Sequence, residues 1–241
     1  MPSVFDLSYT FCEQSTSLYV KREYSGSSSS FEVKHFVDLI RTLNLPTEEE
    51  NSKNRGSFDT LAVPSMTKLH QAGVKFKTRS SKNLFDICFT DKGGKLEIPI
   101  IMIGDSTELI LRNLIAFEQC HCTPNTCYFN DYIILMDNFV NTPNDVELLV
   151  KNGIVENMLG DNNEVSTLFN SLGKGVAVSR QGFYFAPLTK DLNKYYKKPW
   201  NKWKADLKQK YFNTPWTIIS VIAATFLIIL TLIQTVWSIA R

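Results

Sequence analysis

The feature that most constrains this chain is an uninterrupted apolar run near its carboxyl end. From Trp216 to Trp237 the sequence contains no Asp, Glu, Lys or Arg. As a helix, this run would reach about 33 Å, and the hydrocarbon core of a bilayer is about 30 Å thick. Tryptophan at both ends is typical of the two membrane interfaces. The run therefore predicts one transmembrane helix over residues 216–237, and the alternative is a helix buried in a folded core.

Lysines just before this run predict the orientation of the chain. Only one basic residue, Arg241, follows the run. Six lysines precede it within about twenty residues: Lys197, Lys198, Lys202, Lys204, Lys208 and Lys210. Basic flanks stay preferentially in the cytoplasm. The first ten residues lack the basic and apolar regions of a signal peptide. We therefore expect a single-pass protein of the plasma membrane or an endomembrane, with a cytoplasmic body.

Residues 196–215 form a segment with its own pattern. Trp200, Trp203, Leu207 and Tyr211 recur at helical spacing, and the lysines fall mostly on the other faces. One interpretation is a helix in the membrane interface, with Lys197–Lys210 close to anionic lipid headgroups. The alternative is that the aromatic stripe packs against the body while the lysines stay solvated. A calmodulin-like partner is a third interpretation.

Charge and cysteine content narrow the function classes. The chain has 241 residues and a formal net charge of +2, and its basic excess lies next to the apolar run. This distribution argues against nucleic acid as a partner. The five cysteines, at positions 12, 88, 120, 122 and 127, are odd in number and too few for a disulfide framework.

Residues 1–62 are expected to be a loosely ordered remnant with one amphipathic helix. Ser25 to Ser30 is a flexible Ser-rich tract, and Asn44 to Asp59 has almost nothing to bury. Between them, one helical face collects five apolar residues: Val33, Phe36, Val37, Ile40 and Leu43.

Residues 63–195 are expected to be the globular body, with a small antiparallel sheet near its start. Ser65 can cap a short helix that stops at Gly73. Apolar alternation on both sides of the turn at 91–94 predicts a hairpin, and the alternation around Phe76 is a candidate third strand. Pro99 marks the edge or the end of the returning strand.

The rest of the body has helical periodicity. The first helix starts at Asp105 or Ser106 and is apolar on more than one side, so we expect it to be central. Start and stop signals predict three more helices: Asp131 to Phe139, a helix from 142–145 to Gly153, and one from an Asp161/Glu164 capping box to Gly173. The predicted fold class is mainly α with a small antiparallel β-sheet (α+β), plus the carboxyl-terminal transmembrane helix.

The densest group of reactive side chains is Cys120, His121, Cys122 and Cys127. Thiolates and imidazole can hold zinc, but structural sites usually combine two separated ligand pairs. Here all four residues lie in one short segment, so we predict no metal site. His35 and His70 stand alone, and each is interpreted as a surface or packed histidine rather than a catalytic base.

No catalytic motif is present: there is no nucleophile elbow, metalloprotease helix or phosphate-binding loop. We therefore predict no catalytic, cofactor-binding or metal-binding residue and no cofactor. The alternative is a membrane-tethered hydrolase or transferase that uses Cys120 or a carboxylate pair. The acids considered for such a pair are Asp105, Glu108 and Glu118, although helix capping and solvated faces also explain them.

Several blocks resemble a known family. They include 63–77, 96–99, 107–120 and 141–150, followed by AsnLysTrpLysAlaAspLeu at 201–207 and TyrPheAsnThrProTrp at 211–216. In this order and spacing they are similar to the plant family called domain of unknown function 247. The resemblance implies a plant protein with one carboxyl-terminal transmembrane helix and no established activity, and some grass members are associated with pollen self-incompatibility. Members usually have a longer amino-terminal half, which we interpret as missing here.

The sequence thus predicts a membrane-anchored plant protein whose body binds another, unknown protein in recognition or signalling. The bilayer, through 216–237, is the second expected partner, and nucleic acid is excluded. Two alternatives stay open: the tethered enzyme described above, and a truncated fragment without function.

Overall fold

The computed structural model describes residues 35–46, 56, 63–81, 83–177, 181–198 and 215–239, and in the last range it describes the side chains of 219, 220 and 222–238. The helices are α2 (Phe36–Asn44), α4 (Met66–Gln71), α5 (Asp105–His121), the short 3-10 helix η1 (Pro124–Thr126), α6 (Tyr128–Phe139), α7 (Pro143–Lys151), α8 (Asn162–Gly173), α9 (Ala186–Tyr196) and α11 (Pro215–Ile239). The strands are β1 (Lys75–Arg79), β2 (Cys88–Thr90), β3 (Lys95–Pro99), β4 (Ile101–Ile103) and β5 (Val155–Asn157). The prediction of a mainly helical fold with small sheets is confirmed.

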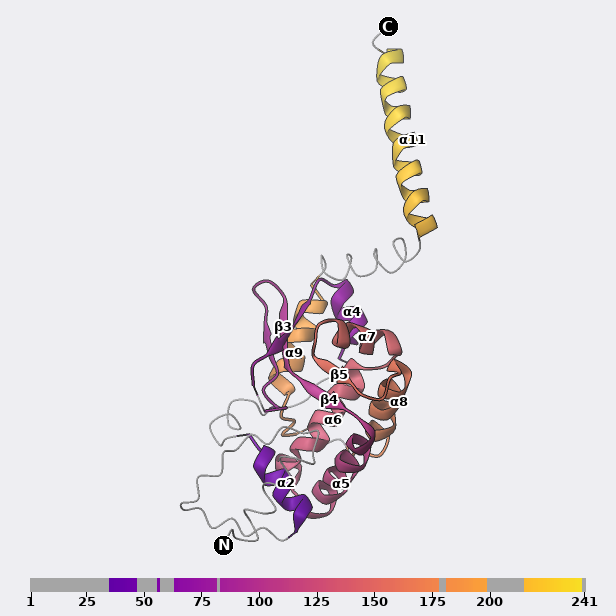
Figure 1. Cartoon of the computed structure of the whole chain (residues 1–241). Coiled ribbons are helices and arrows are strands. Elements are labelled where there is room, and N and C mark those ends of the chain that lie inside the picture. The colour runs from indigo at the N-terminus through magenta and orange to yellow at the C-terminus, as the bar shows by residue number, and fades with distance from the viewer. Residues whose placement is uncertain are drawn as a thin grey trace.

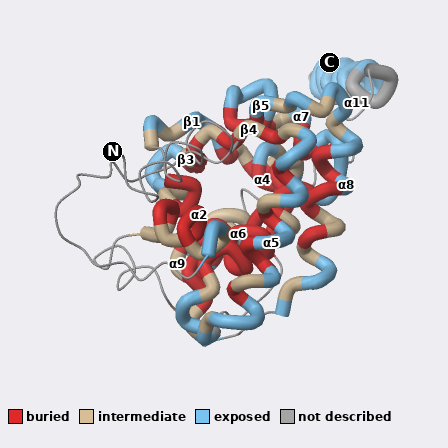
Figure 2. Tube along the Cα trace, turned by 60° about the horizontal axis from the view of Figure 1, so that its bottom comes forward, coloured by how far each residue is buried: buried red, intermediate tan, exposed pale blue. Residues whose placement is uncertain are grey.

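Helix α6 forms the centre of the body. Ile133, Leu135 and Met136 are fully buried, and burial extends around almost the whole helix (Figure 2). A helix that is apolar all round must be covered on all sides. Helices α5 and α8 both pack against it (Figure 1). The expectation that 105–117 would be the central helix is therefore wrong, because α5 has an exposed side that includes Glu108, Arg112 and Asn113.

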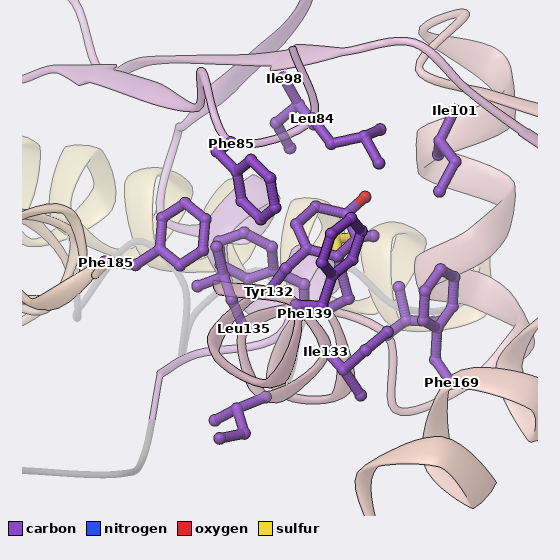
Figure 3. Close-up of a cluster of buried hydrophobic side chains, with 14 of the residues drawn as sticks. Leu84, Phe85, Ile98, Ile101, Tyr132, Ile133, Leu135, Phe139, Phe169 and Phe185 are labelled. Carbon is purple, nitrogen blue, oxygen red and sulfur yellow. The ribbon is translucent and has the colours of Figure 1, made fainter. Parts of the chain in front are cut away.

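Aromatic side chains fill the space between α6 and the segment before β2 (Figure 3). The Phe85 ring lies 5.2 Å from Phe129 and 6.0 Å from Tyr132, measured between centroids, in edge-to-face geometry. Such pairs add about 0.5–1.5 kcal/mol to the burial of the rings. Phe169 of α8 and Phe185, next to α9, belong to the same core. This core fixes the position of α8, and hence of the groove described below.

The sheet topology corrects the sequence prediction. The hairpin is confirmed: β2 pairs antiparallel with β3 around a turn in which Gly93 and Gly94 have positive φ. However, β1 pairs with β3 in parallel, so this sheet of order β1-β3-β2 is mixed. Strands β4 and β5 form a second, parallel pair. Parallel strands need a long crossover, and α5, α6 and α7 supply it between β4 and β5. The alternation of apolar and polar residues within one strand does not indicate which distant strand it pairs with.

The carboxyl-terminal prediction also needs correction. Helix α11 stands apart from the body in Figure 1, and its described side chains are exposed, as at Phe226 and Trp237. Within the described residues, no helix is both long enough and apolar enough to cross a membrane. On this finding, the predictions of a transmembrane helix over 216–237 and of a single-pass membrane localisation are wrong.

Several expectations lie partly or wholly outside the described residues. The Ser-rich tract at 25–30 and most of the loop at 44–59 fall there, as does the aromatic stripe at 200–211. Of the lysines at 197–210, only Lys197 and Lys198 are described, and Lys198 Nζ lies 2.6 Å from Asp91 Oδ1. The contact with anionic lipid and the division into domains stay predictions.

Candidate functional site

A groove of about 640 Å³ runs between α5 and α8. Helix α5 lines it with one residue per turn, at Asp105, Glu108 and Arg112. Helix α8 lines the opposite side with the same spacing of three or four positions, at 164, 167–168 and 171. Leu159, in the segment before α8, completes the lining. Residues spaced by three or four positions share one helical face. The groove is therefore made by two facing helical stripes.

Contacts between the two helices show that they run in the same direction. Arg112 Nη2 lies 3.2 Å from Ser171 Oγ, and further along Gln119 Nε2 donates to the carbonyl oxygen of Gly175 at 2.8 Å. At the opposite end, Gly104, just before α5, lies against Met158, just before α8. Both helix amino termini therefore open onto the same end of the groove.

Local hydrogen bonds fix these two amino termini. The hydroxyl of Thr107 accepts the N–H of Gly104 at 2.9 Å. At the start of α8, Asp161 Oδ1 accepts the N–H of Asn163, also at 2.9 Å, which confirms Asp161 as the predicted cap. Each bond satisfies an N–H that the first turn of a helix leaves without a partner.

The charged side chains of the groove are mainly acidic. Asp105, Glu108 and Glu164 are exposed carboxylates, and Arg112 is the single cation of the lining. Arg112 Nη2 binds Glu108 Oε1 at 2.7 Å, whereas Asp105 and Glu164 form no ion pair with any described residue. Acids in the first turn also complement the helix dipole, which explains their position structurally. That role leaves their carboxylates open to a ligand.

Apolar side chains provide the other component of the groove. Leu168 is only 6% exposed, and with Leu159 it forms the apolar part of the lining. Leu109 and Met158 are 66% and 68% exposed. Leu109 is one turn from Asp105 on α5, and Met158 lies beside Gly104. Two large apolar side chains thus flank a groove whose own lining is partly apolar.

The carboxylates considered for catalysis are not brought together. Asp105 begins α5 and Glu118 lies in its last turn, so the helix separates them by about 20 Å. Glu118 is fully buried: its Oε1 lies 3.0 Å from Arg41 Nε, and its Oε2 accepts the N–H of Asn130 at 3.0 Å. Cys120 is exposed. No hydrogen bond joins Cys120 to a histidine or a carboxylate within the described part of the chain.

The Cys/His segment is likewise occupied by packing and local hydrogen bonds. The Phe117 ring lies 4.8 Å from both the His35 and the His121 rings. Cys127 Sγ donates to the carbonyl oxygen of Thr123 at 3.1 Å. Burial, reinforced by the Glu118 carboxylate, raises the pKa of Cys127 to about 11, which disfavours the thiolate that a metal would need. Across the described ranges, no three His, Cys, Asp or Glu side chains form a group that could hold a metal ion. His70 packs its ring against Phe76.

Comparison with known proteins identifies the family. The family model for DUF247, described as a plant protein of unknown function, matches residues 2–230. The chain belongs to the DUF247 family. It is 32% identical over 231 residues to the UPF0481 protein At3g47200 of Arabidopsis thaliana, a match that covers 88% of this chain and 48% of the relative. It is 30% identical over 217 residues to the putative UPF0481 protein At3g02645 of the same plant, covering 90% of this chain and 38% of the relative. The chain thus spans about half or less of these curated relatives, and no solved structure matches it.

Sequence reasoning missed the buried polar residues that join distant elements of this DUF247 chain. Arg41 reaches from α2 to α5 and also donates to the carbonyl oxygen of Thr126 at 2.6 Å. Asp131 of α6 accepts the N–H of Tyr184 at 2.8 Å. The signal for Arg41 was its position one turn after Val37, on the apolar face of the predicted helix. A charge on such a face implies a buried partner, but the sequence does not say which one.

Proposed function

We propose that this DUF247 chain is a protein-interaction module, acting in recognition or signalling, that binds a segment of another protein in the α5–α8 groove. The observation that carries the proposal is the pair of exposed apolar side chains, Leu109 and Met158, beside a groove with an apolar lining and open carboxylates. Exposed apolar side chains rimmed by polar groups are typical of interaction sites.

The groove is built so that a partner protein can insert its side chains into it. Its two walls belong to helices whose opposite faces are buried in the core, so the groove is largely formed before a partner arrives. A preformed site avoids part of the entropic cost of association. Methionine at the edge adds adaptability, because its flexible thioether can adjust to different apolar surfaces.

Binding without catalysis is the role proposed. A catalytic site requires a nucleophile or an acid–base pair within hydrogen-bond reach. In this chain Cys120 is exposed, Glu118 is buried in an ion pair, and Asp105 lies at the far end of the same helix. A recognition role also agrees with what the family resemblance implied.

Selection from a random peptide library on the full chain tests the proposal. The double variant Leu109→Asp/Met158→Asp places charges on the apolar edges of the groove, and both positions are exposed enough to leave the core intact. Val150→Asp is the matched control, because Val150 is an exposed apolar residue of α7 that does not line the groove.

The expected result is that selected peptides bind the parent chain and Val150→Asp equally, and the double variant at least about tenfold more weakly. If the selected peptides bind the double variant as tightly as the parent, the groove is not the binding site. A selection that yields no binder to the parent chain contradicts the interaction role itself.

A further inference from the structure

We infer that the occupant of the α5–α8 groove is a basic amphipathic helix of a partner protein. This inference rests on the proposed function and specifies the chemistry of the partner. The apolar face of the incoming helix would cover Leu109 and Met158, and its Lys or Arg side chains would pair with Asp105 and Glu164.

Charge complementarity is the first argument. The lining holds three carboxylates and one guanidinium, and that guanidinium is already bound to Glu108 at 2.7 Å and to Ser171 at 3.2 Å. The other two acids, Asp105 and Glu164, form no ion pair with a described residue. A partner that brings cations therefore meets open acceptors, whereas an acidic partner meets repulsion.

The placement of these acids is the second argument. Asp105 belongs to one wall and Glu164 to the other. The apolar lining residues Leu159 and Leu168 come from the α8 side, and the exposed Leu109 comes from α5. A ligand that satisfies this pattern needs an apolar surface together with cations directed toward both walls. A helix with one apolar stripe and basic residues along its borders presents that pattern.

The geometry also disfavours other ligands. Two helix amino termini at one end of a groove would attract an anion, but Asp105, Asp161 and Glu164 stand at these termini and oppose one. A metal ion needs a tighter cluster, and the described residues contain no suitable group of three or more ligands. The same acids repel the phosphate groups of nucleic acid.

Arg112 gives the groove a polarity along its length. It lies about two turns from Asp105 along α5, or roughly 10 Å. It pairs with Glu108 on its own helix and contacts Ser171 of α8 across the groove. Its positive charge repels cations at that end. The basic residues of the ligand therefore belong at the end that holds Asp105 and Glu164.

Two labelled peptides test the inference on the full chain. Both have about 18 residues, or five helical turns, and the same stripe of leucines; one carries lysines at all other positions, and the other carries glutamates. Fluorescence anisotropy measures the affinity of each for the parent chain. The charge-reversal variant is Asp105→Lys/Glu164→Lys, and the matched control is Glu147→Lys/Asp191→Lys, which reverses two exposed acids outside the groove.

The lysine peptide should bind the parent chain at least about tenfold more tightly than the glutamate peptide, and added salt should weaken its binding. Asp105→Lys/Glu164→Lys should remove most of that preference, Glu147→Lys/Asp191→Lys should keep it, and Arg112→Ala should increase the affinity for the lysine peptide.

Equal binding of both peptides, a preference for glutamate, or equal losses in the two charge-reversal variants would overturn the inference. The wider proposal is separable from it. If library peptides still depend on Leu109 and Met158 while the lysine preference is absent, the groove binds protein and only the chemistry assigned to the partner is wrong.

Discussion

Glu108 and Glu118 lie on the same helix, and each pairs with an arginine, Glu108 with Arg112 and Glu118 with Arg41. The distances are similar, at 2.7 and 3.0 Å. The surroundings are opposite: the Glu108 and Arg112 side chains are 48% and 51% exposed, and those of Glu118 and Arg41 are 0% and 10% exposed. One helix therefore carries two Glu–Arg ion pairs, one exposed to solvent and one buried in the core.

The difference separates binding from folding along α5. An exposed pair contributes about 0–1 kcal/mol, so Glu108 and Arg112 can exchange their partners at little cost. A buried pair contributes little relative to apolar residues, but the loss of one member leaves a charge without compensation. The Glu118 end of α5 thus joins α2, α5 and α6, while the Glu108 end remains available to a ligand.

The largest expected effect comes from Arg41→Met. This change leaves the Glu118 carboxylate buried with only backbone donors such as the Asn130 N–H, and we expect a loss of about 3–5 kcal/mol in the free energy of unfolding at neutral pH. Urea denaturation of the full chain measures it. Arg41→Met/Glu118→Leu removes both charges and should recover most of the loss. If the double variant is no more stable than Arg41→Met, the buried charge is not the cause.

The same pair predicts a pH dependence. Burial raises the pKa of Glu118, and the Asn130 N–H and Arg41 oppose that rise only in part. Because the pKa is higher in the folded state, the folded chain holds this proton more tightly than the unfolded one. The stabilisation is complete below the unfolded-state pKa and is lost as pH rises through the folded-state value. Arg41→Met should widen the pH range between the unfolded-state and folded-state pKa of Glu118. The loss of unfolding free energy that this variant shows in urea should therefore be smaller at pH 5 than at pH 8. A loss that does not change with pH contradicts the attribution to the buried Glu118 charge.

Asp145 sharpens the comparison, because it is a buried carboxylate without an arginine. Its oxygens accept the Thr67 N–H at 2.7 Å, the Thr142 N–H at 3.0 Å and the Thr142 hydroxyl at 2.9 Å. Asp145→Ala removes these bonds, and with them the Asp145 half of the capping box that it forms with Thr142 at the start of α7. We expect a loss of about 2–3 kcal/mol in the free energy of thermal or urea unfolding. Glu147→Ala, at an exposed position of the same helix, is the control and should change stability by about 0.5 kcal/mol or less.

These residues show what local sequence patterns can predict. The ThrProAsnAsp start of α7 and its end near Gly153 are both confirmed. So is the cap of α8 by Asp161, and so is the hairpin turn at 91–94. Each depends on groups only a few positions apart, and capping or turn chemistry acts over that range.

Features that depend on distant partners were not predictable in this way. Arg41 and Glu118 are 77 positions apart, and β4 meets β5 only after three α-helices, α5, α6 and α7. The groove needs α5 and α8 side by side, a relation that neither helix encodes alone. Its acids were identified at 105, 108 and 164, but as caps and solvated residues, because a helical pattern does not reveal which exposed face will meet another helix.

The Glu108–Arg112 pair provides the next smaller effect. A double-mutant cycle with Glu108→Gln and Arg112→Gln should give a coupling energy of about 0.3–0.5 kcal/mol in urea unfolding, because both side chains stay solvated and are spaced i, i+4. High salt should reduce it further. A coupling above about 1.5 kcal/mol would mean that the exposed end of α5 contributes to folding as strongly as the buried end, and the contrast between the two ends would disappear.

Cys120→Ser should have the smallest effect, although Cys120 is only two positions from Glu118. The thiol is exposed to solvent, whereas the Glu118 side chain, on the same turn of α5, is buried. We expect a change of about 0.5 kcal/mol or less in urea unfolding and no change in the affinity of the library-selected peptides. The corresponding Glu118→Ser change should be strongly destabilising, because it leaves Arg41 buried without its carboxylate. If Cys120→Ser instead keeps the fold and the peptide affinity but abolishes the function of the full chain in the plant, the thiol has a chemical role, and the binding-only proposal fails at that residue.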